Sequence, residues 1–319
     1  MIENIQNINR TNGWLSIHIF FKGNIYSSEC DRIILEVINT YVEKYKEKDI
    51  FKKFFFIRYS ELGTHVRFRL FGNSDVLKDR GLITLEKHIE NNFPSSLYII
   101  PNSNETNKNY ILQKYLPETD RYGGVHGIKI AEDFFYYSSL CSIELIKDIK
   151  ERDQSSRLGK GILTMLILLQ TFFERAEDAS IFIKNYGINY MKPFTNNEED
   201  LVLLSDIFND GFNKQSDKLI RHTSAIWEAL EERTSINPVL DLYSKNLYLV
   251  KNKLYELQIN NLLSKNSEAI ENWNTALNVI IPSYIHMMNN RLGISIKDES
   301  YLAHIIYKSL NQINKTTTE

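Results

Sequence analysis

The chain has 319 residues, of which 43% are hydrophobic and 24% are charged, the composition of a globular protein with a full apolar core. Its formal net charge of −2 argues against a protein whose main role is to bind a nucleic-acid backbone, because such proteins normally have an excess of basic residues. The two cysteines, Cys30 and Cys141, form no CxxC pair, and the histidines show no metal-ligand spacing. We therefore expect no metal and, since no cofactor motif is visible, no cofactor.

The N-terminal segment has neither the charged region nor the apolar core of a secretory signal. The strongest apolar run, Ile162 to Leu169, is far too short to span a membrane. These features predict a cytoplasmic protein without a membrane span.

The first 124 residues are predicted to form a mixed α/β part. Helical spacing of apolar residues covers 29–45 and 75–92. The segments with strand character are 14–21, 54–59, 64–70, 96–100 and 110–115. A short turn at 61–63 joins the second and third of these as a hairpin, so we expect a mainly antiparallel sheet.

Residues 125–314 have helical periodicity almost throughout, and 315–319 should form a frayed tail. Breaks are expected near 153–156, 186–197, 209–213, 235–238 and 293–297. Proline and glycine are too sparse at the junction for a flexible linker. The sequence thus predicts an α+β fold, with the sheet in the first half and helices in the second, as one compact domain over 1–319.

The strand THVRFRL places His65, Arg67 and Arg69 on one face, because successive strand side chains point to opposite sides. The two guanidinium groups are then ~6–7 Å apart, and such groups suit bidentate capture of carboxylates. A solvated face whose arginines pair with neighbouring glutamates explains the same pattern, and the spacing alone favours it.

The segment YLPETDRYGG contains a second candidate site at a strand end. Gly123 and Gly124 permit backbone angles that other residues avoid, and the turn holds Glu118 close to Arg121. A structural turn with a local Glu–Arg pair is the simpler interpretation.

The segment SYIHMMNNRLG contains the third candidate, His286, on a helix that Gly293 should end. Pro282 suits the start of this helix or a kink in it. A core histidine bonded to a neighbour is the simpler interpretation, although histidine is the side chain best suited to proton transfer near neutral pH.

Taken together and in order, these segments resemble the C-terminal domain of lantibiotic dehydratases, also called the thiopeptide-type bacteriocin biosynthesis domain. The resemblance covers nearly the whole chain. Its motifs are Trp14–Leu15, the FIRY strand at 55–59, the HLRLR-like strand at 65–69, Y-x-x-E-x-x-RYGG at 115–124, AE-x-x-F at 131–135 and H-M-x-x-NR-L at 286–292. The family usually has Asp-Ser shortly after AE-x-x-F, and this chain departs from it with Ser138–Ser139.

The resemblance implies removal of glutamate from glutamylated Ser or Thr in a ribosomally synthesised precursor peptide, leaving dehydroalanine or dehydrobutyrine. The family's elimination residues map onto Arg67, Arg69, Arg121 and His286, which should converge on one cleft. We expect Glu118, His65, Asn290 and Arg291 of the same motifs to bind substrate.

The longer glutamylation domain of full-length dehydratases is not seen in this sequence, so we expect a stand-alone form with a separate tRNA-dependent glutamylation protein as partner. We expect no direct contact with nucleic acid.

Free-standing relatives in thiopeptide pathways instead join two dehydroalanines in a formal [4+2] cycloaddition that forms a pyridine and expels the leader peptide. We favour elimination because the full arginine and histidine set is present. A third interpretation is a non-catalytic subunit that presents peptide to a partner enzyme. Loss of the arginines and the histidine would be the sequence signature of such a subunit.

Overall fold

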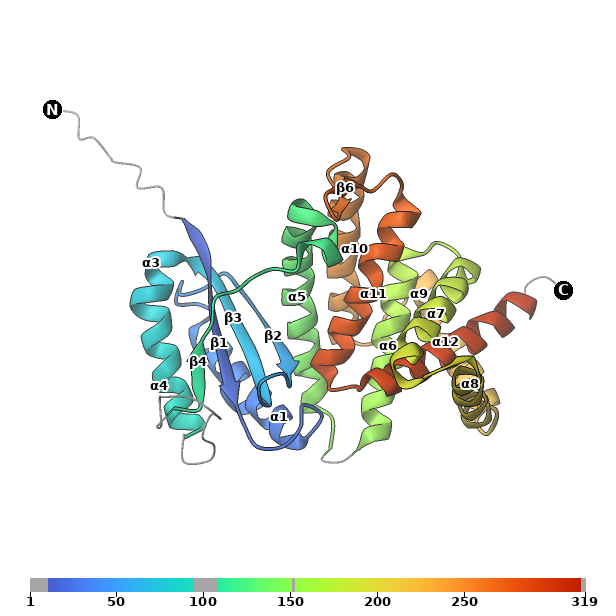
Figure 1. Cartoon of the computed structure of the whole chain (residues 1–319), viewed down its shortest axis with the longest axis horizontal. Coiled ribbons are helices and arrows are strands. Elements are labelled where there is room, and N and C mark those ends of the chain that lie inside the picture. The colour runs from blue at the N-terminus through green and yellow to red at the C-terminus, as the bar shows by residue number, and fades with distance from the viewer. Residues whose placement is uncertain (1–10, 95–107, 151–152, 317–319) are drawn as a thin grey trace. The chain divides into compact units, whose positions relative to one another are not determined.

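The computed structural model describes residues 11–94, 108–150 and 153–316, which divide into two compact units, residues 1–116 and 117–319 (Figure 1). The boundary precedes the Gly123–Gly124 turn, which belongs to the second unit rather than to the first as predicted. A single domain over the whole chain stays a prediction, and each unit is described by itself.

The first unit contains a four-stranded sheet in the order β2-β3-β1-β4, and every pairing in it is antiparallel, as predicted. The strands are β1 (Asn12–Phe20), β2 (Lys53–Tyr59), β3 (His65–Asn73) and β4 (Tyr110–Leu112). The predicted hairpin is confirmed, with Tyr59 opposite His65 beside the turn. The strand expected at 96–100 lies outside the described residues.

Two helical segments complete the described part of this unit. The first runs through α1 (Ser28–Arg32), η1 (Ile33–Asn39) and α2 (Thr40–Tyr45), and the second through α3 (Ser74–Val76), η2 (Leu77–Gly81) and α4 (Leu82–Asn92). Both predicted helices are confirmed, but η1 and η2 are π-helical. Tyr41 packs edge-on against Phe68 of β3 at 6.1 Å, so this helical segment covers the face of the sheet opposite Arg67.

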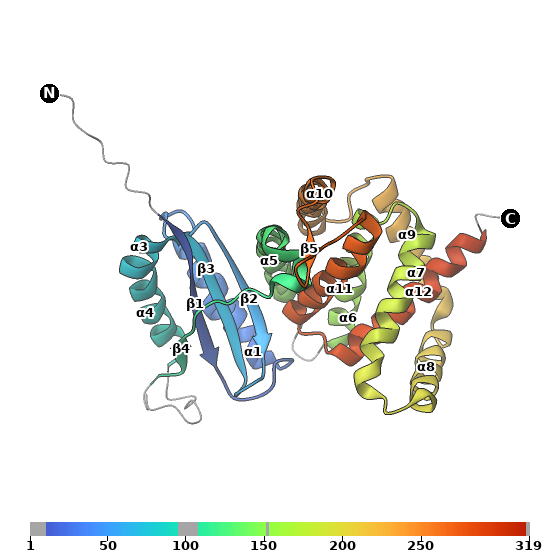
Figure 2. The same cartoon turned by 45° about the horizontal axis from the view of Figure 1, so that its top comes forward.

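The second unit is mostly helical, as predicted. Its larger elements are η4 (Thr119–Tyr122), α5 (Gly124–Lys147), α6 (Gln154–Phe172), α7 (Ala176–Met191), α8 (Glu198–Asn213), α9 (Ser216–Glu231), α10 (Pro238–Ile259), α11 (Trp273–Leu292) and α12 (Ile296–Thr316) (Figure 2). A short 3-10 turn, Lys192–Phe194, follows α7.

Four details of the helical prediction were wrong. Helix α8 continues through the break predicted at 209–213 and ends at Asn213. Helix α7 continues through the break predicted from position 186, because Tyr186 and Gly187 are buried parts of its packed face. A small hairpin, β5 (Ser264–Lys265) with β6 (Glu268–Ala269), interrupts residues predicted to be helical. Helix α12 includes residues 315 and 316 of the predicted tail, whereas 317–319 lie outside the described residues.

Helix α11 lies in the core of this unit. Asn272 caps it by accepting a hydrogen bond from the backbone N–H of Thr275 at 2.9 Å, and Gly293 ends it with a φ of 74°. Pro282 lies inside the helix, so it does not start it. Tyr284 stacks on Phe134 of α5 with ring centroids 4.0 Å apart, which fixes the rotation of α11. No helix within the described residues is long and apolar enough to cross a membrane.

The Gly123–Gly124 turn supports the start of α5, and Gly124→Ala should destabilise the protein. Gly124 has a φ of +81°, and a Cβ atom there would lie 2.1 Å from the Oγ of Ser264. Left-handed strain with displacement of β5 should cost ~1–3 kcal/mol in the free energy of unfolding, measured by chemical denaturation. Gly159→Ala is the control, because Gly159 lies in α6 with nothing within 4 Å of the added atom. Equal stability of both variants would contradict this account of the turn.

Candidate functional site

Arg67 and Arg69 lie on one face of β3, as the strand pattern predicts. The Arg67 guanidinium carbon lies 3.3 Å from the ring centroid of Tyr59, and that of Arg69 lies 4.3 Å from the ring of Tyr115. Stacking on an aromatic ring holds a guanidinium group flat. Arg67 is partly exposed, whereas Arg69 is buried. Within the described residues no carboxylate forms an ion pair with Arg67, so the solvated Arg–Glu interpretation does not fit this residue.

His65 holds Arg67 in place. Its Nδ1 lies 2.7 Å from the carbonyl oxygen of Gly63, and its Nε2 lies 3.3 Å from the Arg67 Nε–H donor. The neutral tautomer with the proton on Nδ1 satisfies both bonds. Burial among neighbouring rings and the charge of Arg67 lower the pKa of His65, although its bond to Gly63 opposes the shift.

His18 on β1 is a second histidine on this face. Its ring stacks on that of His65 with centroids 4.7 Å apart. Burial, followed by the nearby His65, Arg67 and Arg69, lowers the pKa of His18 to about 3. Neither imidazole then adds charge near neutral pH. Arginine, neutral histidine and aromatic rings therefore make up this sheet face, a chemistry suited to anionic groups on a ligand.

In the second unit, Arg121 lies in η4 and pairs with Glu118, Nη1 to Oε2, at 3.0 Å. Both side chains are more than 60% exposed, so the local pair expected of a structural turn is present and is weak. The backbone N–H of Ser264 donates to the carbonyl of Gly123 at 3.1 Å. This bond fixes the turn, and with it the position of Arg121.

His286 lies on α11 and pairs with Glu299 of α12. Its Nδ1 is 3.0 Å from Oε2 of Glu299, whose side chain is fully buried, while the imidazole is 26% exposed. The hydroxyl of Tyr186 on α7 donates to the other carboxylate oxygen of Glu299. A carboxylate fixed in this way holds the Nδ1–H tautomer and stabilises the imidazolium that forms when Nε2 takes a proton.

Tyr190 is an aromatic neighbour of His286. Its ring lies 5.6 Å from the His286 ring and stacks on Tyr186 at 4.4 Å. Burial and the nearby Glu299 raise the pKa of Tyr190, whereas Arg121 acts in the opposite direction through its charge. The Tyr190 hydroxyl therefore stays protonated near neutral pH. Tyr190 thus contacts the ring of His286, and Arg121 belongs to the same helical unit.

Arg291 and Asn290 follow His286 on α11. Arg291 is fully buried, donates from Nε to the Oγ of Ser139 at 3.0 Å and from Nη1 to the carbonyl of Met287 at 2.7 Å. These contacts account for Arg291 as a packing residue that holds α11 against α5. The backbone carbonyl of Asn290 accepts from Gly293 at the helix end. A role in substrate binding stays a prediction for Asn290 and Arg291, as it does for Glu118 and His65.

Sequence reasoning missed Glu299, Tyr186 and Tyr190. Glu299 follows Asp298 in the first turn of α12, where acidic residues are common because of the helix dipole. Tyr186 and Tyr190 are one helical turn apart in an apolar helix, which is typical of core packing. No local pattern links these residues to His286, since the contact depends on how α7, α11 and α12 pack together.

The His286–Glu299 pair gives a testable prediction. Glu299→Gln should lower the rate of any proton transfer by His286 by up to about 10⁴-fold, because an amide can donate to Nδ1 and reverse the tautomer. Nitrogen-15 chemical shifts of a selectively labelled protein report that tautomer without an activity assay. Glu199→Gln, at an exposed acid of α8, is the matched control. An unchanged tautomer and rate in Glu299→Gln would contradict the assignment.

A model of the family described as "Lantibiotic biosynthesis dehydratase C-term" matches residues 14–310. The chain belongs to this family. It is also 26% identical over 313 residues to the epidermin biosynthesis protein EpiB of Staphylococcus epidermidis, a match that covers 98% of the chain. The chain spans only 27% of the length of EpiB. The family resemblance seen in the ordered motifs is thus confirmed for this C-terminal dehydratase domain.

Solved structures with a similar fold include three that match nearly the whole of this chain. TsrL matches with a TM-score of 0.72 at 12% identity, covering 96% of both chains. TbtD, the pyridine synthase of thiomuracin biosynthesis, matches with a TM-score of 0.69 at 13% identity, covering 95% of this chain and 99% of its own. MibB, a tRNA-dependent lantibiotic dehydratase of Microbispora sp. 107891, matches with 0.67 at 15% identity, covering 96% of this chain and 28% of its own. At these identities the matches show a shared fold.

Within the described residues, no three His, Cys, Asp or Glu side chains lie close enough together to hold a metal ion.

Proposed function

We propose that this protein eliminates glutamate from glutamylated Ser or Thr residues of a ribosomally synthesised precursor peptide, giving dehydroalanine or dehydrobutyrine. The observation that carries the proposal is the His286–Glu299 pair, which orients a partly exposed imidazole base. Membership of the dehydratase C-terminal family and the presence of Arg67, Arg69, Arg121 and His286 support it.

In the proposed reaction His286 is the general base. With Nδ1–H donated to Glu299, Nε2 has the lone pair that takes the α-proton of the esterified residue. The electron pair of the broken C–H bond forms the Cα=Cβ double bond, and the Cβ–O bond breaks. Glutamate leaves with the bonding electrons of that oxygen, and Glu299 stabilises the imidazolium that remains.

The arginines supply positive charge for the two groups that become more negative. The α-proton is weakly acidic, so the developing enolate needs hydrogen-bond donors, and the departing glutamate has carboxylates of its own. Arg121, which belongs to the same helical unit as His286, is assigned to the enolate. Arg67 and Arg69, held flat on Tyr59 and Tyr115, are assigned to the glutamate. The proposal requires all of them to act on one substrate.

The glutamyl ester must be made before this step. We assign it to a separate tRNA-dependent glutamylation protein, so that the chain itself meets peptide rather than tRNA. The nearly balanced charge agrees with this assignment. We also propose that the protein acts in the cytoplasm, where charged tRNA and precursor peptide are both available.

The second candidate is formation of a pyridine from two dehydroalanines with release of the leader peptide. Its specific support is that the chain covers 99% of the pyridine synthase TbtD. Mass spectrometry of the peptide products distinguishes the two functions. Elimination requires a glutamylated peptide to lose glutamate, and cyclisation requires a dehydrated linear peptide to be consumed. Conversion of the second peptide and not the first would replace our proposal with the cyclase.

A further inference from the structure

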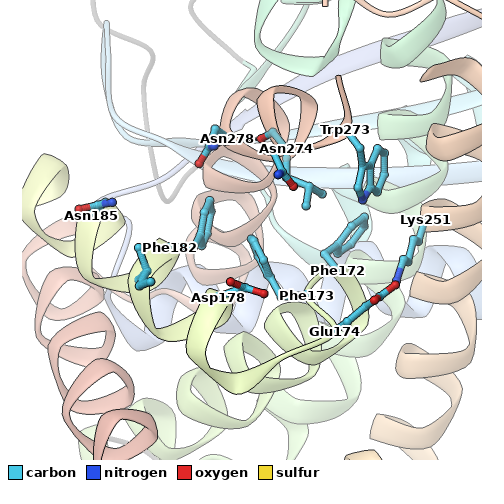
Figure 3. A pocket seen from close by; sticks show the side chains of 12 residues that line it. Phe172, Phe173, Glu174, Asp178, Phe182, Asn185, Lys251, Trp273, Asn274 and Asn278 are labelled. Carbon is cyan, nitrogen blue, oxygen red and sulfur yellow. Dashed lines mark hydrogen bonds between the residues drawn. The ribbon is translucent and has the colours of Figure 1, made fainter. Parts of the chain in front are cut away.

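A groove of about 490 Å³ lies in the helical unit between α7 and the first turns of α11 (Figure 3). Helix α7 packs mainly on α12, whereas α11 packs on α5 and α6, so the seam between α7 and α11 is only partly filled. Phe172 and Phe182 are buried along it, and Phe173 and Trp273 are partly exposed. The groove therefore offers apolar and aromatic surface to a ligand.

The groove runs along the same two helices that carry the His286 cluster. Asn278 of the groove and His286 are eight positions apart on α11 (278 to 286), and Phe182 and Tyr190 are eight positions apart on α7 (182 to 190). Eight residues of α-helix span ~12 Å. An extended peptide covers that distance with about three or four residues. A peptide whose modified residue reaches His286 could thus place a neighbouring side chain in the groove.

The polar lining of the groove favours a cationic side chain. Two acidic residues, Glu174 and Asp178, line the groove together with one basic residue, Lys251. Figure 3 shows the Asp178 carboxylate between Phe182 and Phe173. Carboxylates next to aromatic faces bind ammonium and guanidinium groups through ion pairing and cation–π attraction. The exposed amides of Asn185, Asn274 and Asn278 on the two walls can both donate to and accept from a peptide backbone.

We propose that this groove is a subsite for the substrate peptide, which holds a Lys or Arg side chain about three or four residues from the residue that reacts. The inference deepens the proposed function, since it takes the substrate to be a peptide.

Binding of unreactive peptides tests the subsite. The probes are fluorescein-labelled peptides of Gly, Ala and Gln with Ala at the reacting position and one Lys placed in turn at each position up to five residues away. Fluorescence anisotropy should show about tenfold tighter binding for Lys than for norleucine at one position, from a partly exposed ion pair with a cation–π contact. Glu174→Gln with Asp178→Asn should remove most of this preference.

Glu177→Gln is the matched control, because Glu177 lies in the same turn of α7, pairs with Arg175 and does not line the groove. It should keep the full preference for Lys. A flat response across all Lys positions, or a preference that survives in the double variant, would overturn the subsite. Because the probes cannot react, failure of the elimination assay leaves this result standing. A flat response with normal elimination removes the subsite alone.

Discussion

His286→Ala should slow release of glutamate from a glutamylated precursor peptide by ~10²–10⁴-fold, because positioned proton transfer typically contributes that factor. The glutamylated peptide should accumulate, since the step that makes the ester does not involve this residue. Mass spectrometry detects the accumulation, because a retained glutamyl ester adds mass and dehydration removes it. Circular dichroism should show an unchanged helical content.

The matched control for this variant is His222→Ala, at an exposed histidine of α9. It should eliminate glutamate at the normal rate. Under the cyclase alternative the His286→Ala reaction would instead accumulate dehydrated, linear peptide. Normal dehydration together with normal ring formation in His286→Ala would contradict both enzymatic roles and leave His286 as a core residue satisfied by Glu299.

Arg121→Ala should produce the second large effect. Loss of one donor to a developing oxyanion typically costs ~2.7–4 kcal/mol of transition-state stabilisation, which corresponds to a rate loss of about 10²–10³-fold. Arg121→Lys should recover only part of the rate, because an ammonium group keeps the charge but not the guanidinium fork. Steady-state kinetics with a glutamylated peptide should show the loss in kcat more than in KM.

Arg221→Ala on α9 controls for the loss of an exposed arginine elsewhere in the helical unit. The local pair with Glu118 is exposed and weak, so loss of that pair explains little of the expected effect. Equal rates for Arg121→Ala and Arg221→Ala would remove Arg121 from the mechanism.

Periodicity predicted much of the fold because the elements bury one regular face. The strand at 64–70 alternates Val66, Phe68 and Leu70 with the polar set, and the apolar set is buried in β3 as expected. The polar face is less open than the alternation suggests, because His65 and Arg69 are buried too. The same method missed the π-helical turns in η1 and η2, where the helical period changes locally without any change in the type of residue. It also predicted a break at Tyr186 that α7 does not have. The hydroxyl of Tyr186 donates to Glu299 of α12, which lies more than a hundred positions later in the chain, so no local pattern indicates this contact.

The candidate site was predictable where its residues share a strand or a short motif. Arg67 and Arg69 are two positions apart, and Glu118 and Arg121 belong to one turn. Sequence spacing therefore predicts that each pair lies close together. The contact between His286 and Glu299 depends on the packing of α11 against α12, which no spacing rule describes. The order of the motifs could be recognised in the sequence through the family resemblance. Glu299, the carboxylate that orients His286, became visible only in the structure.

One incubation tests the central claim most directly. The purified protein is mixed with a chemically glutamylated precursor peptide, without tRNA or any other protein, and the peptide mass is followed over time. The account predicts loss of glutamate and appearance of the dehydrated residue. A glutamylated peptide that stays intact, while a dehydroalanine-containing linear peptide offered in parallel closes a ring and releases its leader, would contradict the account.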